Sequence, residues 1–335
     1  MRSTYLGIGG QIHLSQLETK QQQVEGRVIK ALSGFFTVDT RAGAIIAQLP
    51  GRMKKERLAT DIATVGDWVT ISLNPDGTGN IEAVAERHSV LSRSRPSGYN
   101  VRRLSVDREQ VLVANPDQIV MVFSIKKPRP SLRKLDRFLV VAELNKLPAI
   151  ICVNKIDLLA NSDEARSMFQ VYEDIGYQLL YTSVKSGEGI DELAAVLQEK
   201  ISVMTGSSGV GKSSLLNAIQ PGLGLGVSEV SQATEKGLHT TRHAEMFPLD
   251  EGGYVVDTPG IRGLALFDVE PEELDAYFRE IAPLVPLCQF SDCTHRHEPG
   301  CAVRAALEDG RLSPARYDSY LRLRDEHEQL EDRQY

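Results

Sequence analysis

Two short loops in this sequence carry the chemistry of a purine-nucleotide site, and they stand in an unusual order. The tetrapeptide Asn154-Lys155-Ile156-Asp157 lies about fifty residues upstream of a glycine-rich segment, 206–213, that ends in Gly-Lys-Ser. Proteins with both loops ordinarily place the glycine-rich segment first. Because a sheet needs only strands that pair and loops that reach one edge, the rotated order can still build one site. The sequence therefore predicts a nucleotide site in permuted chain order.

The glycine-rich segment has the composition of a phosphate-binding loop. Glycine lets backbone N–H groups approach phosphate oxygens, and the N-terminus of the following helix completes the anion cradle. Lys212 is expected to reach the β- and γ-phosphates, and the Ser213 hydroxyl to bind Mg²⁺. The residues predicted to contact the nucleotide here are Gly206, Ser207, Ser208, Gly209, Val210, Gly211, Lys212, Ser213 and Ser214.

The upstream tetrapeptide is typical of a loop that selects guanine. The Asp157 carboxylate can accept hydrogen bonds from guanine N1 and N2, whereas adenine has no such pair of donors. Asn154 and Lys155 are expected to brace and cover the base. Ser183 follows a predicted strand, where backbone amides can close on guanine O6. GTP and GDP are the predicted ligands, with Mg²⁺ accompanying the nucleotide.

A third loop indicates where the γ-phosphate is sensed. Asp257 follows an apolar strand and opens Asp-Thr-Pro-Gly. Its carboxylate can hold the water shell of Mg²⁺, and the Gly260 amide would contact the γ-phosphate. The segment 237–242 lies where a mobile loop contributes a threonine to Mg²⁺ and the γ-phosphate. Thr241 is favoured for that role, and Thr240 is the alternative.

Hydrolysis requires a group that orients the attacking water. Many GTPases have a glutamine directly after this third loop, but this chain has Ile261. Because isoleucine cannot form a hydrogen bond, another side chain must act, and His239 is the nearest candidate. The alternative is that His239 is an exposed loop residue without a catalytic role. The predicted catalytic residues are therefore His239, Thr241 and Asp257.

A cluster of three thiols and one imidazole predicts a metal site. Cys288, Cys293, His295 and Cys301 lie within fourteen residues, in a polar segment rich in turns. Three sulfurs and one nitrogen suit tetrahedral Zn²⁺ and leave no position open for catalysis, so one structural zinc ion is expected. The alternatives are His297 in place of His295, or unrelated reduced cysteines.

The elements that position these loops fall into three segments. Five short β-patterned runs between residues 24 and 87 predict a small barrel, with an OB-fold favoured. A generic β-domain with Phe35, Phe36 and Trp68 in its core is the alternative. Strands at 119–123, 149–153, 178–182 and 201–205 then alternate with helices at 132–145, 163–175, 191–198 and 212–219. This alternation predicts a parallel, doubly wound sheet, and the chain beyond 260 is helical.

Composition limits the classes of function. The chain of 335 residues has a net charge of −7, so its surface as a whole does not suit non-specific nucleic-acid binding. Six arginines lie between 87 and 108, which predicts contact with a defined RNA surface, although a solvated linker is the alternative. The N-terminus lacks a signal-peptide pattern and no apolar run is long enough to span a membrane, so a cytoplasmic protein is expected.

Together these features resemble the bacterial RsgA (YjeQ) GTPases, over residues 24 to 325. The resemblance rests on Asn-Lys-Ile-Asp, the phosphate loop, His-Thr-Thr-Arg, Asp-Thr-Pro-Gly-Ile and the run from Cys288 to Cys301. It implies an OB-fold, a circularly permuted GTPase domain and a C-terminal zinc domain. It also implies a monomer that binds the small (30S) ribosomal subunit and its rRNA, and whose GTP hydrolysis the subunit stimulates during late maturation.

The expected organisation is a multidomain α/β protein. It comprises an extension at 1–23, an OB-fold β-barrel at 24–90, a basic linker at 91–117, a circularly permuted GTPase domain at 118–265 and a helical zinc-binding domain at 266–335. Two other functions stay open from the residues alone. One is a nucleotide-gated RNA-binding module in which hydrolysis is incidental, and the other is a metabolic or signalling GTPase whose barrel binds protein.

Overall fold

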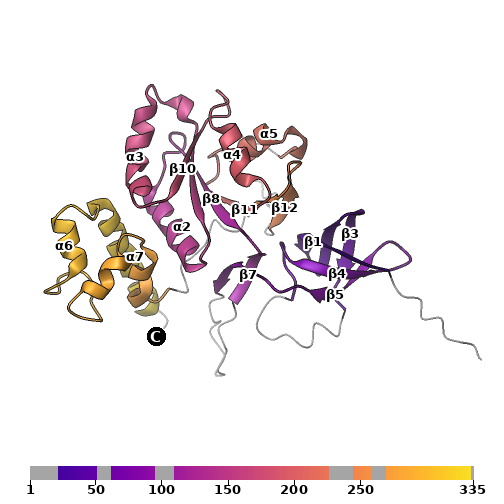
Figure 1. Ribbon diagram of the computed structural model, residues 1–335, viewed down its shortest axis with the longest axis horizontal. Coiled ribbons are helices and arrows are strands. Elements are labelled where there is room, and N and C mark those ends of the chain that lie inside the picture. Colours follow the sequence, from indigo (N-terminus) through magenta and orange to yellow (C-terminus); the bar gives the residue numbers. More distant parts are fainter. Residues whose placement is uncertain (1–21, 51–61, 95–108, 226–243, 258–268, 333–335) are drawn as a thin grey trace, which may run out of the picture.

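The computed structural model describes residues 22–50, 62–94, 109–225, 244–257 and 269–332. Figure 1 shows a central mixed α/β unit that stands between an N-terminal barrel and a C-terminal helical module. Within the described part of the chain, no helix is long and apolar enough to cross a membrane.

The five predicted N-terminal strands form a closed barrel. They are β1 (Gln23–Leu32), β2 (Phe35–Thr40), β3 (Gly43–Gln48), β4 (Trp68–Leu73) and β5 (Gly79–Val84). Their spatial order is β1-β2-β3-β5-β4, and pairing of β4 with β1 closes the ring. Phe36 is buried, but Phe35 and Trp68 are 50% and 41% exposed. The alternative of a core that contains Phe35, Phe36 and Trp68 together is therefore wrong. Neighbouring residues of a strand face opposite sides of the sheet, so Phe35 and Phe36 cannot both point inward.

A β-hairpin follows the barrel where the sequence suggests a linker. Strands β6 (Val90–Ser94) and β7 (Glu109–Ala114) pair in antiparallel fashion. The chain approaches this hairpin closely at Gly66, where a Cβ atom would lie 2.0 Å from the Ala114 carbonyl oxygen. Gly66 has a φ of +96°, so both its conformation and the lack of space require glycine there. The arginines at 95, 102, 103 and 108 lie outside the described residues.

The central sheet contains six strands in the order β10-β9-β8-β11-β13-β12. They are β8 (Gln118–Ser124), β9 (Ala149–Asn154), β10 (Gln178–Thr182), β11 (Ile201–Thr205), β12 (Glu245–Pro248) and β13 (Tyr254–Asp257). The first five in this order are parallel, and only β12, which sequence reasoning missed and which also pairs with β1 of the barrel, is antiparallel. The direction of chain progression reverses between β8 and β11, and ligands of such sheets bind beside the carboxyl ends of the strands at this point.

Helices cover both faces of the sheet, as a doubly wound fold requires. Helices α2 (Leu132–Leu144) and α3 (Ser162–Asp174) pack on one face, and α4 (Ile190–Leu197) and α5 (Lys212–Ile219) on the other. Strand β8 shows why: Ile119, Met121 and Phe123 join the first core, while Val120 and Val122 join the second. Short 3₁₀ helices η1 (Ile156–Leu158) and η2 (Pro221–Leu223) follow β9 and α5.

The C-terminal module is helical, as expected, but two of the four helices described there are 3₁₀ helices. It contains η4 (Pro271–Tyr277), η5 (Ala282–Leu287), α6 (Ala302–Glu308) and α7 (Pro314–Asp332). Figure 1 shows the module on the side of the sheet that carries α2 and α3. Its buried residues Leu274, Phe278 and Tyr320 belong to the same apolar core as Phe138 of α2. The module is therefore packed against the central domain.

Candidate functional site

The two nucleotide-binding loops meet at the carboxyl edge of the sheet. Asn154, the last residue of β9, is 2% exposed. Its Nδ2 donates to the Val210 carbonyl oxygen at 2.9 Å, and its Oδ1 accepts from the Thr182 hydroxyl at 3.2 Å. Asn154 thus joins the tetrapeptide loop, the phosphate loop and the end of β10. Thr182 is a bracing residue that sequence reasoning did not identify.

Lys155 makes a second connection between the loops. Its backbone is left-handed, with φ of 63°, and its Nζ donates to the Gly209 carbonyl at 2.5 Å and to the Lys127 carbonyl at 2.7 Å. Desolvation lowers the pKa of Lys155, an effect that the charge of Asp157 partly opposes. Its ammonium group is therefore held between the phosphate loop and the loop that follows β8, and the residue lines the cleft.

Asp157 lines a cleft of about 280 Å³. Its Oδ1 accepts a hydrogen bond from the buried Ser183 hydroxyl at 2.7 Å. The turn that carries Ser183 is closed by hydrogen bonds from the Ser186 and Gly187 amides to Ser183. The cleft is lined by Asn154, Lys155, Asp157, Leu158, Val184, Lys185, Gly211 and Ser214. The two predicted loops and the turn after β10 thus share one cavity.

The glycines of the phosphate loop occupy positions that other residues cannot. A Cβ atom on Gly206 would lie 2.2 Å from the Val122 carbonyl oxygen, and one on Gly211 would lie 2.4 Å from Asn154 Nδ2. Gly209 also has a positive φ, of 79°. Val210 is buried, Ser208 is exposed and Ser207 is half-buried. The close packing explains why the loop needs glycine at these positions.

Helix α5 begins directly after this loop. No side chain caps its N-terminus and its first turn contains no acidic residue, which leaves the amide end suited to an anion. Lys212 and Ser213 are half-buried in this first turn, and the Lys212 Nζ donates to the Gly206 carbonyl at 2.9 Å. The lysine therefore folds back over the loop.

The hydrolytic residues are described only in part. Asp257 ends β13, and its Cα pairs with that of Met204, next to the last residue of the strand that leads into the phosphate loop. His239, Thr240, Thr241, Gly260 and Ile261 lie outside the described residues. Their predicted roles therefore remain predictions.

The four predicted metal ligands come together in the C-terminal module. One ligand atom from each of Cys288, Cys293, His295 and Cys301 lies within 4.8 Å of the other three. The His295 Nδ1 is 3.6 Å from Cys288 Sγ and 3.4 Å from Cys301 Sγ. Tetrahedral zinc would hold such a nitrogen and sulfur about 3.5 Å apart, so the cluster fits this ion. His297 is exposed and is not part of it.

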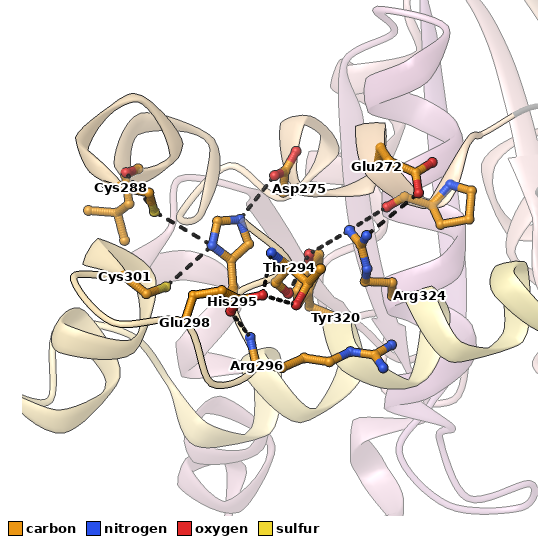
Figure 2. Close-up of polar contacts among 12 residues, drawn as sticks. Glu272, Asp275, Cys288, Thr294, His295, Arg296, Glu298, Cys301, Tyr320 and Arg324 are labelled. Atoms are coloured by element: carbon orange, nitrogen blue, oxygen red, sulfur yellow. Dashed lines mark hydrogen bonds and ion pairs between the residues drawn. The ribbon is translucent and has the colours of Figure 1, made fainter. Parts of the chain in front are cut away.

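Asp275 orients the imidazole from the other side. Figure 2 shows the His295 ring between the two thiols and this carboxylate. The His295 Nε2 lies 3.0 Å from Asp275 Oδ2, which directs Nδ1 toward the sulfurs. Such a carboxylate–histidine pair fixes the ring and raises its basicity as a ligand. Asp275 lies twenty positions before His295 in an acidic run, and no spacing pattern in the sequence marks it.

The loop around the cluster is held by its own side chains. Glu298 accepts hydrogen bonds from the Thr294 hydroxyl and from the amides of Thr294, Arg296 and His297. Burial alone would raise the pKa of Glu298, but these hydrogen bonds lower it well below its usual range. Burial raises the pKa of the Cys293 thiol to about 12, so a cation would be needed to stabilise its thiolate.

A buried ionic cluster fixes this module to the central domain. Arg316 of α7 is 2% exposed and pairs with Asp136 of α2 and, at 2.6 Å, with Glu280. Asp136 also accepts from the Tyr172 hydroxyl at 2.8 Å, and the guanidinium lies over the Phe278 ring. Burial opposes the charge of Arg316, but its hydrogen bond to Glu280 and its carboxylate neighbours raise the pKa overall. All three charges are therefore satisfied without water.

Two family models match the chain. The model described as RsgA GTPase matches residues 84–267, and the model described as RsgA N-terminal domain matches residues 25–81. Relatives named "Small ribosomal subunit biogenesis GTPase RsgA" occur in Caldanaerobacter subterraneus and Gemmatimonas aurantiaca. The first is 38% identical and covers 94% of this chain and 99% of the relative. The second is 42% identical and covers 90% and 96%.

Two solved structures are similar to this chain over most of its length. The crystal structure of YjeQ from Thermotoga maritima has a TM-score of 0.72 and 37% identity, over 91% of this chain and 99% of the other. The structure of YloQ, described as a circularly permuted GTPase, has a TM-score of 0.69 and 33% identity, over 94% and 98%. The permuted order inferred from the loops therefore agrees with the fold of these proteins.

Proposed function

This chain belongs to the RsgA GTPase family, and from that premise we propose that it binds the small ribosomal subunit, assists its late maturation and hydrolyses GTP in response to it. The observation that carries the proposal is the pair of bonds from Asn154 and Lys155 to Val210 and Gly209. Through them, loops for base and phosphate that are reversed in the chain form one site.

Guanine recognition is proposed to rest on Asp157. The hydrogen bond from Ser183 holds one carboxylate oxygen in the cleft, so the carboxylate is oriented before the base arrives. Guanine N1 and N2 would donate to it, while Lys155 would cover the ring from the phosphate-loop side. Adenine has an acceptor at N1 and a C–H group at C2, so it would leave the carboxylate without its two hydrogen-bond donors, at the cost of an unpaired polar group.

Phosphate binding and hydrolysis are proposed to occur at the head of α5. Lys212 and the loop amides would hold the β- and γ-phosphates, while Ser213 and Asp257 would hold Mg²⁺, which offsets negative charge there. A water oxygen attacks the γ-phosphorus, the bond to the bridging oxygen breaks, and GDP leaves with that oxygen. His239 is proposed to orient this water, with Thr241 or Thr240 contacting the γ-phosphate and Gly260 sensing it.

A structural zinc ion is proposed at Cys288, Cys293, His295 and Cys301. All four donor positions of a tetrahedral ion would be filled by protein, so the ion would supply rigidity and no reaction step. Asp275 would hold the His295 tautomer that presents Nδ1 to the metal. The rigid module and the barrel would then bind ribosomal RNA on either side of the GTPase domain.

We further propose that the protein acts as a monomer. Action on ribosomal subunits would place the protein in the cytoplasm. The test is co-sedimentation of the full chain with purified small subunits, with either GDP or a non-hydrolysable GTP analogue. Retention that depends on the analogue and survives washing is expected, and absence of binding in both nucleotide states would overturn the proposal.

A further inference from the structure

A basic surface lies between the nucleotide cleft and the C-terminal module, and neither the nucleotide site nor the zinc site uses it. Residues 126–134 contain five cationic side chains and no acidic one, in a chain of net charge −7. These are Lys126, Lys127, Arg129, Arg133 and Lys134, here called the β8–α2 basic surface. All five are exposed to solvent.

The charges of this surface are largely uncompensated. Among the described residues, the only carboxylate that reaches it is that of Glu326, 3.5 Å from Arg133, and this carboxylate also pairs with Arg137. Asp136, the next acid in the sequence, is buried against Arg316. The first turn of α2 adds no acidic residue, whereas those of α3 and α4 have two each. By contrast, Arg304, Arg311 and Arg322 of the C-terminal module each form an ion pair.

The backbone beneath these side chains is held in place. The Ser124 hydroxyl contacts the carbonyl oxygens of Lys126, at 2.9 Å, and Pro128, at 2.7 Å. The Lys127 carbonyl accepts from Lys155 at 2.7 Å. The carbonyl groups thus face the protein, and the cations stand on an ordered loop. Such ordering lowers the entropy cost of binding an extended anion.

We propose that the β8–α2 basic surface is a docking site for the phosphate backbone of RNA. A polyanion fits because phosphates would neutralise several adjacent charges at once, with release of counterions. The surface bears no exposed aromatic side chain for base stacking, so it would bind the backbone without reading sequence. This inference rests on the proposed function, since the RNA would belong to the small ribosomal subunit.

Docking here would act close to the nucleotide. Lys155 bonds to the Lys127 carbonyl on this surface and to the Gly209 carbonyl in the phosphate loop. The Lys126 ammonium also contacts the Leu158 carbonyl, directly after Asp157, at 3.4 Å. RNA held at this surface would therefore lie against the loop that grips the base.

The test is the salt dependence of binding to purified small subunits. The variant Arg129→Ala/Lys134→Ala removes two charges that lie outside the nucleotide site. Arg166→Ala/Lys200→Ala removes two exposed charges elsewhere in the same domain. Arg129→Lys/Lys134→Arg keeps the charge. We expect the first variant to make the negative slope of log affinity against log salt shallower by about 1.4–1.8. The other two variants should keep the wild-type slope.

An unchanged slope for Arg129→Ala/Lys134→Ala would overturn the inference. Protein-free small-subunit rRNA provides a second arm. A variant that loses affinity for intact subunits but binds this RNA with the wild-type slope would show that the surface docks on protein, and would also overturn it. If wild-type protein fails to bind intact subunits in every nucleotide state, the proposed function fails, while the rRNA arm still reports on the surface. GTP affinity of each variant should equal that of wild type.

Discussion

The two modules that flank the GTPase sheet are attached to it in different ways. The barrel has a core of its own around Val28, Val38 and Ile71, while Ile29 and Ala31 of β1 also pack against the core that contains α2 and α3. The C-terminal module has no separate core among the described residues, because its buried side chains join that of α2 and α3.

The polar contacts at the barrel junction are exposed, whereas those at the C-terminal junction are buried. At the barrel, β1 pairs with β12 at one position, where Lys30 and Glu245 form an ion pair 40% and 36% exposed, and Tyr254 donates to Asp39 at 3.0 Å. At the C-terminal module, Arg316 is fully enclosed with two carboxylates. The barrel thus keeps a core of its own and meets the central domain through a small junction of mixed polar and apolar contacts, whereas the zinc module and the GTPase domain should respond as one body.

Loss of the metal site should have the largest effect. Cys293→Ala removes a zinc ligand, and structural zinc typically supplies about 10 kcal/mol or more of folding free energy. If the module had an independent core, the GTPase sheet would be spared, but the shared core predicts weaker protection from hydrogen exchange in α2 and α3 as well. Protection from hydrogen exchange should fall in 269–332 and in these helices but not in β1–β5. Cys152→Ala, at a buried thiol outside the cluster, is the control for metal content. Metal-free protein with full protection in 269–332 would contradict the account.

Breaking the buried ionic cluster should come next. Arg316→Ala leaves Asp136 and Glu280 enclosed without a counter-charge, which should lower the free energy of unfolding by about 3–5 kcal/mol. Arg322→Ala removes an exposed α7 cation paired with Asp318 and should cost less than about 1 kcal/mol. Denaturant unfolding measures both. Equal losses of stability in the two variants would show that the buried ionic cluster does not hold the C-terminal module rigidly to the GTPase domain.

The nucleotide site lies on the sheet between the two junctions, so its variants should leave both intact. Asp157→Asn replaces an acceptor with a donor that faces guanine N1 and N2, at an expected cost of about 2–4 kcal/mol in GTP binding. Xanthine nucleotides, whose C2 oxygen accepts, should bind the variant better. Unchanged GTP affinity in equilibrium titration would mean that the base is not read by Asp157.

The smallest effect is expected at the barrel junction. Lys30→Ala removes an exposed ion pair, so the free energy of unfolding should fall by only about 0.2–1 kcal/mol, with less effect at high salt. The measurement is denaturant unfolding at low and high ionic strength. A salt-independent loss of several kcal/mol would show that the barrel junction stabilises the protein as strongly as the C-terminal junction.

Local patterns were sufficient for most of the fold. Strand 178–182 was predicted with the bounds that the structure gives, since its apolar run is flanked by clear helix signals. The four ligands of the metal cluster followed from spacing, since thiols and imidazole so close in sequence must share a turn. Strand β12 was missed because four residues at an antiparallel edge carry too short a pattern.

Contacts between residues far apart in the chain could not be predicted from the sequence. Asp275 and Thr182 act through partners 20 and 28 positions away, and Asp136 meets Arg316 across 180 positions. No periodicity encodes such pairs, because they arise only when helices dock. For the same reason the shared core of the zinc module could not be foreseen, although the helical character of the module could.

The central claim is GTP hydrolysis that depends on the small ribosomal subunit, and single-turnover hydrolysis across a titration of purified small subunits tests it most directly. The account predicts that the rate for wild-type protein rises steeply and saturates as subunits are added. His239→Ala should bind GTP normally but lose about 10²–10⁴ of the stimulated rate. A wild-type rate that does not change with subunit concentration would contradict the account.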